Sequence, residues 1–362
     1  MNGRLRMACL AATVITGLAP LAASSATASA APAPTASTTV NWPGFHDNAA
    51  DTGYNAKETT LGAGNVAGLS QQWLVSTRYP AGGADPTIGG GRLYTTAGPL
   101  KAWNALTGAH EWTANTQVTL YNVTFGGGRL FAEGANGLVD AFSAVTGKLE
   151  WSFTQPHDGS GSEPVYANGL VYLAGYFSMS AYNPATGAQV WSTTLSGLVR
   201  SFQAVSDGRL YLNTEGDPTS KPKVNFLALN ASTGAVLWSR EVGSLSDIET
   251  ASPVASNDTV YQCSGSTLYA LWAKTGDIRW TESDGCDIDS TPALANGVLY
   301  AAEYQSGQIY AINASTGAVE WSAPGTGGDC AAPAVANGVL YVPMEAQTVA
   351  AYDASTGALL CT

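Results

Sequence analysis

The sequence predicts an all-β protein, a single β-propeller of seven four-stranded blades. Three observations lead to this prediction: a short pattern repeated about every 40 residues, strand-like runs on both sides of each copy, and no segment with helical periodicity. The copy at residues 311–321 reads AINASTGAVEW, and Ala, Thr-Gly and a final Trp keep these offsets elsewhere. The other copies end at Trp112, Trp151, Trp191, Trp238, Trp280 and Cys361.

Each repeat can be divided into four short strands. In the copy above, residues 308–312 are rich in β-branched and aromatic residues and predict a strand, Thr-Gly predicts a tight turn, and the run to Trp321 predicts the outer strand. Upstream, Val298-Leu-Tyr300 predicts a further strand, and the small residues at 292–296 predict an inner one. Small residues innermost and Trp outermost are typical of a propeller blade. A solenoid is the alternative, but it would need polar capping repeats, and none is visible.

The closure of the ring leaves two possibilities open. Residues 71–77, which include Trp73, predict an outer strand ahead of the first complete repeat, while residues 358–362 are the outer run of the last one. Either Trp73 displaces that last run in blade seven, or the N-terminal strand closes an incomplete eighth blade. We predict seven blades, because seven inner strands can be counted in the sequence.

The pattern Ala-x-[Asn/Asp]-x-x-Thr-Gly-x-x-x-Trp resembles the tryptophan-docking repeat of the pyrroloquinoline-quinone (PQQ)-like β-propeller superfamily. The stretch from Trp42 to Trp73 is similar to the lead-in of its quinoprotein alcohol dehydrogenases. The superfamily also includes the non-catalytic scaffold lipoprotein of outer-membrane barrel assembly. The resemblance implies that each outer-strand indole packs against the neighbouring blade and donates its N–H to backbone there. The residues that receive this docking role are Trp73, Trp112, Trp151, Trp191, Trp238, Trp280 and Trp321.

The N-terminus has the features of an export signal. Arg4 and Arg6 precede an apolar run, and Ala28-Ser-Ala30 offers a small-residue cleavage site, so we expect cleavage near Ala30 and a secreted or periplasmic protein without a membrane span. Residues 41–72 lack alternation, and we expect them to wrap across the propeller edge or one face. The expected divisions are the signal peptide at 1–30, a disordered Ala/Pro/Thr leader at 31–40, the lead-in at 41–72 and the propeller at 73–362.

The charge of the chain excludes some classes of partner. The formal net charge is −12, and it becomes about −14 without Arg4 and Arg6. Nucleic acid and anionic membrane surfaces would repel such a protein. We therefore expect a protein, a peptide or a glycan as the partner, and a monomeric propeller.

The cysteines predict disulfides rather than a metal site. Removal of the signal peptide with Cys9 would leave four of the five cysteines, and an even number in an exported chain suggests two disulfides, with three connectivities open. Their positions along the repeats favour Cys263–Cys286 and Cys330–Cys361, and the second bond would staple the C-terminal strand that lacks its Trp. No paired C-x-x-C pattern supports zinc.

A set of charged residues stands just before the inner strands, where the propeller would bring them to one mouth of the channel. Converging carboxylates would suit a hard cation such as Ca²⁺ or a basic partner. The alternative is that these side chains are solvated independently on an acidic protein, and whether a metal binds there is left open. The candidates are Asp85, Glu163, Arg200, Glu249, Asp289 and Asp329.

Catalytic motifs are scarce in this sequence. The three histidines, His46, His110 and His157, stand apart from any G-x-S-x-G elbow, and no H-E-x-x-H motif or phosphate-binding loop is present. We therefore predict an exported, non-catalytic scaffold that binds through its loop faces and channel mouth and needs no cofactor. The alternative implied by the resemblance is a PQQ- and Ca-dependent dehydrogenase that oxidises alcohols or sugars. Those enzymes stack the quinone on a disulfide of adjacent cysteines, and no two cysteines are adjacent here.

Overall fold

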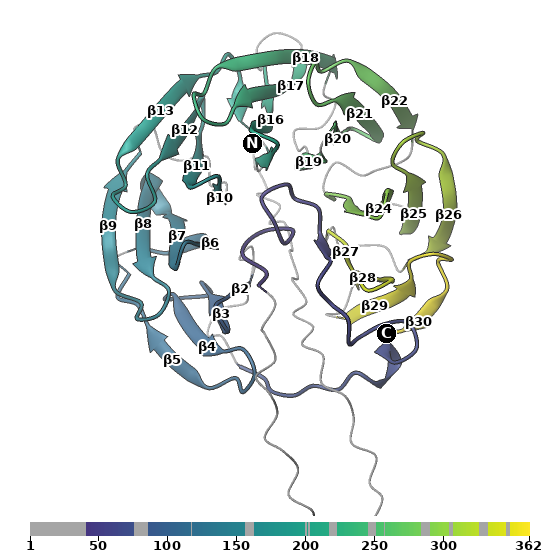
Figure 1. Ribbon diagram of the computed structural model, residues 1–362, viewed down its shortest axis with the longest axis horizontal. Helices are drawn as coiled ribbons and strands as arrows, with labels where there is room; N and C mark the ends of the chain where they lie inside the picture. The colour runs from purple at the N-terminus through teal and green to yellow at the C-terminus, as the bar shows by residue number, and fades with distance from the viewer. Residues whose placement is uncertain are drawn as a thin grey trace, which may run out of the picture.

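Seven β-sheets stand around a common axis in the computed structural model, which confirms the prediction of seven blades (Figure 1). The structure describes residues 41–75, 86–116, 118–155, 163–199, 201, 203–216, 223–244, 251–256, 258–283, 290–303, 307–325, 332–344 and 348–362. In this part of the chain, no helix is long and apolar enough to cross a membrane.

The blades follow one another in chain order, each with its inner strand first and its outer strand last. Blade one contains β2 (Thr87–Gly89), β3 (Arg92–Thr95), β4 (Lys101–Asn104) and β5 (His110–Thr113). Blade two contains β6 (Leu120–Gly126), β7 (Arg129–Gly134), β8 (Leu138–Ser143) and β9 (Leu149–Thr154), with η2 (Ala135–Gly137) between β7 and β8. Blade three contains β10 (Val165–Ala167), β11 (Leu170–Gly175), β12 (Ser178–Tyr182) and β13 (Gln189–Thr194). Blade four contains β14 (Leu198–Val199), β15 (Ala204–Ser206), β16 (Arg209–Glu215), β17 (Lys223–Asn230) and β18 (Val236–Ser244).

The remaining blades complete the ring. Blade five contains β19 (Val254–Ala255), β20 (Thr259–Ser264), β21 (Thr267–Trp272) and β22 (Ile278–Ser283). Blade six contains β23 (Ala293–Ala295), β24 (Val298–Ala302), β25 (Gln308–Asn313) and β26 (Val319–Pro324). Blade seven contains β27 (Ala334–Ala336), β28 (Val339–Met344), β29 (Thr348–Asp353) and β30 (Leu359–Cys361). The lead-in forms β1 (Tyr54–Asn55) and η1 (Val66–Gly68).

The repeated sequence pattern forms the same hairpin in every blade. In blade six, Asn313 Oδ1 accepts hydrogen bonds from the backbone N–H groups of Ser315 and Thr316, and Gly317 takes a φ of +78°. Ala311 pairs with Trp321 across the hairpin, and a register shift follows directly after this alanine. The small side chain and the shifted register leave the indole free to lean toward the next blade.

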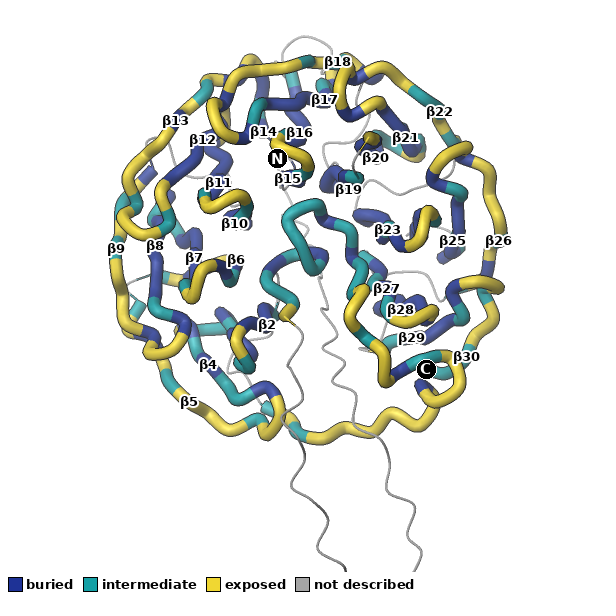
Figure 2. Tube along the Cα trace, in the orientation of Figure 1, coloured by how far each residue is buried: buried dark blue, intermediate teal, exposed yellow. Residues whose placement is uncertain are grey.

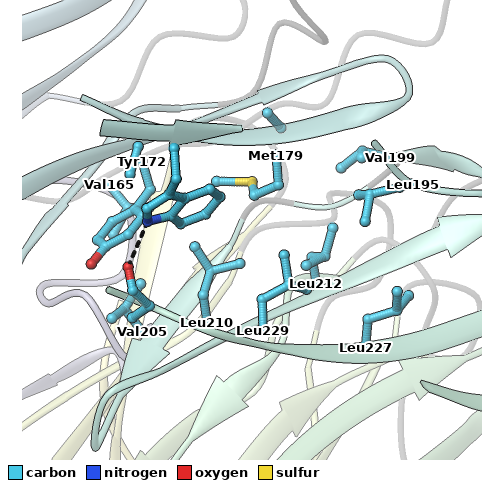
Figure 3. Close-up of a cluster of buried hydrophobic side chains, with 14 residues drawn as sticks. Val165, Tyr172, Met179, Leu195, Val199, Val205, Leu210, Leu212, Leu227 and Leu229 are labelled. Carbon is cyan, nitrogen blue, oxygen red and sulfur yellow. Dashed lines mark hydrogen bonds between the residues drawn. The ribbon is translucent and has the colours of Figure 1, made fainter. Parts of the chain in front are cut away.

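The hydrophobic core lies between blades rather than in one central mass. Figure 3 shows the cluster that joins blades three and four, where Met179 and Tyr172 meet Leu210 and Leu229. Within this cluster, Trp191 Nε1 donates to Ala231 O over 3.0 Å. The outer strands are largely exposed, as Figure 2 shows, so the apolar residues at inner and middle strands supply most of the buried surface.

The ring closes through its inner strands. β1 pairs in parallel with β27, and β30 keeps its own pairing with β29 at the rim. Residues 71–75 form no strand. The expectation that an N-terminal outer strand closes the ring is therefore wrong, because β30 itself occupies the outer position next to β29 in blade seven.

The first part of the lead-in, residues 41–55, lies inside the ring and is called the channel segment below (Figures 1 and 2). It touches the blades in order, and backbone N–H groups of inner strands donate hydrogen bonds to its carbonyls in six of them. Its hydrogen-bonded partners are Ile88 in blade one, Phe125 in blade two, Glu163 in blade three, Val205 in blade four, Ala255 in blade five, Leu294 in blade six and Val335 in blade seven. The segment therefore fills the channel instead of wrapping an edge or a face, and η1 follows it to cover blade seven near Tyr341.

Candidate functional site

A pocket opens beside the channel segment where it passes blades two and three. Its lining includes three aromatic residues, Phe45, Phe125 and Tyr166. It also includes three carboxyl groups, Asp47, Asp51 and Glu163. Two of these acids come from the channel segment, and the third comes from the residue pair that leads into β10, so the site exists only when segment and ring are assembled.

Glu163 holds the channel segment in place. Its Oε1 atom accepts the backbone N–H of Phe45 over 2.9 Å and the hydroxyl of Thr124 over 3.0 Å. The carboxyl group is buried, and a Cβ atom on Gly44 would come within 2.8 Å of that same oxygen. A larger residue at position 44 would therefore displace the Glu163 carboxyl group that holds the segment.

Asp51 is the most deeply buried acid of the pocket. Its side chain is 3% exposed, and Oδ2 has no hydrogen-bond partner in the described part of the chain. Burial raises the pKa of Asp51 well above its usual range, and the negative charge of Glu163 raises it further. Both effects favour the protonated form of this carboxyl group over the charged form.

The neighbouring groups of the segment are also perturbed. Burial raises the pKa of Asp47 to about 6, against the opposing effects of the Asn48 amide and the charge of Lys57. Burial lowers the pKa of His46 to about 4, so this ring is neutral at pH 7. Its Nδ1 atom lies 3.0 Å from Asp51 O, and its ring stacks on Phe45 with centroids 4.7 Å apart.

Of the six residues predicted to ring the channel mouth, the structure describes Glu163, which lies at the pocket. The other five, Asp85, Arg200, Glu249, Asp289 and Asp329, lie outside the described residues, and their convergence stays a prediction. No group of three or more His, Cys, Asp or Glu within the described ranges is arranged to hold a metal ion. Sequence reasoning missed Asp47 and Asp51, because nothing local shows that a turn-rich lead-in enters the channel.

The docking tryptophans lie at the junctions between blades. Five of them donate the indole N–H to a backbone carbonyl of the next blade over 2.9–3.1 Å, namely Trp151, Trp191, Trp238, Trp280 and Trp321. Trp112 packs over Gly147, and its buried Nε1 has no hydrogen-bond partner among the described residues. Trp73 packs over Gly108 of blade one. Because blade seven has no docking Trp of its own, Trp73 fills the junction between blades seven and one.

Tyrosines that the repeat pattern did not single out for docking strengthen these junctions. Tyr300 Oη donates to Ala354 O over 3.1 Å, the same carbonyl that accepts the indole of Trp321. Tyr261 and Trp280 share Ala314 O in the same way. The recurrent Tyr of the second strand was the sequence signal for this role.

The cysteines differ from the predicted pairing. Cys361 is a free thiol, so the expected Cys330–Cys361 bond is wrong. Cys361 lies on the outermost strand and packs beside Val66 and Val339 in an apolar cluster, three strands away from the inner strand that follows Cys330. Cys263 is buried and disulfide-bonded, but Cys286 and Cys330 lie outside the described residues, so Cys263–Cys286 stays a prediction.

Comparison with known proteins places this geometry in a family. A family model described as "Outer membrane protein assembly factor BamB" matches residues 57–162, 154–307 and 264–360. The assembly factor BamB of Yersinia pestis is 28% identical over 235 residues, which cover 57% of this chain and 56% of that protein. A tetrathionate hydrolase of Acidithiobacillus ferrooxidans is 27% identical over 280 residues, which cover 60% of this chain and 53% of that protein. The chain thus spans little more than half the length of these relatives.

A solved structure extends the likeness in fold. A europium-containing methanol dehydrogenase matches with a TM-score of 0.74 and 14% identity, and the match covers 89% of this chain and 84% of that one. At this identity the likeness concerns the fold alone. Together with the family model, which spans most of the chain, the seven blades and their docking tryptophans show that the chain belongs to the PQQ-like β-propeller family described as outer membrane protein assembly factor BamB.

Proposed function

We propose that this protein is an exported, non-catalytic scaffold that holds a protein partner on the loop-bearing face of its propeller. The observation that carries the proposal is the channel segment, which fills the centre of the ring with the protein's own backbone and contacts every blade. A binding function is then left to the faces. The N-terminal signal-like sequence supports export, and the names of the BamB relatives, assembly factors, support a protein as the partner.

The two faces of the propeller differ in what they expose. Loops that join the second strand to the third, and the outer strand to the next blade, share one face, and the Thr-Gly turns lie on the other. On the first face, Tyr121, Tyr176 and Phe177 leave 42%, 42% and 56% of their surface exposed. The turn that carries Tyr176 and Phe177 is held by two backbone hydrogen bonds. The N–H of Leu195 donates to Phe177 O, and the N–H of Val199 donates to Tyr176 O. Exposed aromatic residues on a rigid turn are typical of protein-binding surfaces.

The alternative function is a PQQ- and Ca-dependent dehydrogenase, and the methanol dehydrogenase fold is the finding that favours it. The described residues do not fit this cofactor. The channel segment occupies the centre of the ring, Glu163 Oε1 already accepts two hydrogen bonds, and no adjacent cysteines exist for stacking.

Site-specific photo-crosslinking tests the scaffold. A photoreactive residue at Phe177, in the full chain expressed in an exporting bacterial host, should trap a discrete protein partner. Val145 is the matched control, because it is 60% exposed on the Thr-Gly face. Equal adducts at both positions, or none at Phe177, would argue against a partner on the loop face.

Cofactor addition tests the alternative. The purified protein, mixed with PQQ and Ca²⁺, should show no stoichiometric cofactor absorbance and no alcohol-dependent dye reduction. Saturable PQQ binding with turnover would support the dehydrogenase function and contradict the scaffold function.

A further inference from the structure

The pocket beside the channel segment contains three carboxyl groups in an unusual setting. Asp51 lies in a bend of the segment with a φ of +54°, and Glu163 faces it from blade three. Asp47 lines the same pocket. A cluster of acids is common on an acidic protein, but here two of the three carboxyl groups are buried at 2–3% exposure.

The decisive feature is the buried oxygen of Asp51 that lacks a donor. Two side-chain donors of the pocket lining, those of Asn48 and Thr124, already donate to other groups. The Asn48 amide donates to Asp47 Oδ2 over 3.3 Å and to Thr52 Oγ1 over 2.6 Å. The Thr124 hydroxyl donates to Glu163 Oε1 and to Pro164 O. A buried acceptor without a partner costs about 1–3 kcal/mol, and a ligand with an N–H group would remove that cost.

The rest of the lining indicates the kind of ligand. Phe45, Phe125 and Tyr166 surround the acids with aromatic surface. Aromatic faces and carboxylates together attract organic ammonium groups. A calcium ion would need about six to eight oxygen ligands, and the described residues offer no metal-binding group of three. The ligand must also carry N–H groups to satisfy Asp51 Oδ2, which excludes a quaternary ammonium.

We propose that this pocket binds a small primary ammonium compound, with Asp51 Oδ2 accepting an N–H from the ligand and the aromatic residues covering its carbon chain. The site is assembled from the channel segment and blades two and three, and it does not depend on the proposed function of the loop face.

The charges around Asp51 predict how binding responds to pH. Burial and Glu163 raise the pKa of Asp51, while His46 contributes no charge at pH 7, because burial lowers its pKa to about 4. The other charged groups nearby are Asp47, which lines the pocket, and Lys57, whose charge acts on Asp47. Where Asp51 is protonated, a bound cation takes the place of that proton, so binding releases a proton. The affinity should therefore rise with pH, by up to about tenfold per pH unit below the pKa of Asp51.

Calorimetric titration of the full chain with ethylammonium tests the proposal. We expect saturable binding to the wild-type protein at pH 8, weaker binding at pH 6, and at least tenfold weaker binding to Asp51→Asn at pH 8. Asp140→Asn is the matched control, because Asp140 is also buried with a raised pKa but hydrogen-bonds Ser152 away from the pocket. This control should bind like the wild type.

Several outcomes would overturn the proposal. The first is that ethylammonium does not bind even in large molar excess over the protein. The second is that Asp51→Asn binds ethylammonium as tightly as the wild type does. The third is that tetramethylammonium or Ca²⁺ binds more tightly than ethylammonium. If Asp51→Asn fails to fold by circular dichroism, the pH dependence of the wild type decides, and an affinity that does not fall between pH 8 and pH 6 refutes the site.

Discussion

At the scale of single residues, each junction between blades depends on a glycine beneath an indole. Gly317 turns its hairpin with a φ of +78°, and a Cβ atom there would come within 2.8 Å of the Trp280 ring. The glycine is therefore needed twice, for its backbone conformation and for the room it leaves. The same arrangement recurs as Gly108–Trp73, Gly147–Trp112, Gly187–Trp151, Gly234–Trp191, Gly276–Trp238 and Gly357–Trp321.

The two requirements can be separated by a matched pair of substitutions. Gly297 has a φ of +82°, yet a Cβ atom there meets nothing within 4 Å. We expect Gly297→Ala to cost about 1–2 kcal/mol of unfolding free energy from backbone strain alone. Gly317→Ala should cost about 2 kcal/mol more, because Trp280 must also move. Urea unfolding measures both, and equal losses would show that the indole does not need the glycine.

At the scale of elements, the channel segment is the piece of chain that joins the most distant parts of the fold. It contributes β1 to blade seven and backbone carbonyls to blades one, two, four, five, six and seven. Isolated strands of two residues are not stable by themselves, so its order comes from the inner strands around it. In turn, it satisfies inner-strand N–H groups that would otherwise face an empty channel.

Removal of this segment should loosen the whole ring. We expect a variant without residues 41–55 to melt about 10 °C or more below the wild type in a thermal scan, because six inner strands lose a hydrogen-bonded partner. A synthetic peptide of residues 41–55 should raise the melting temperature with concentration, and a scrambled peptide should not. An unchanged melting temperature in the deletion variant would mean that the blades alone hold the ring.

At the scale of the whole molecule, the ring is a closed series of blade junctions. Blade seven ends in Cys361, where the other blades have Trp, and the missing indole is supplied by Trp73 from ahead of blade one. The N-terminal part of the chain therefore closes the ring at two places, through β1 near the axis and through Trp73 at the rim. Closure at both radii keeps the first and last blades together.

Loss of the rim closure should be measurable by itself. We expect Trp73→Ala to cost about 3 kcal/mol of unfolding free energy, as expected for a packed indole. Trp272→Ala is the control. Trp272 is 43% exposed, and the Cζ atom of Arg279 lies 4.0 Å from the centroid of its ring. This substitution should cost about 0.5–1 kcal/mol of unfolding free energy. Similar losses in the two variants would indicate that Trp73 does not contribute to closure.

The sequence by itself determined the blades. Strand alternation, the Asn-x-x-Thr-Gly turn and the Ala–Trp spacing are local features, and each acts within about a dozen neighbouring residues, so the repeat could be interpreted without long-range information. Only the tertiary structure decided the path of residues 41–55, the role of Trp73 at the last junction and the pocket around Asp51. Phe45 and Glu163 stand 118 residues apart, and no periodic pattern links them. Their contact arises because a closed ring leaves an axis lined with backbone N–H groups, and the segment that satisfies those groups brings its own acids with it.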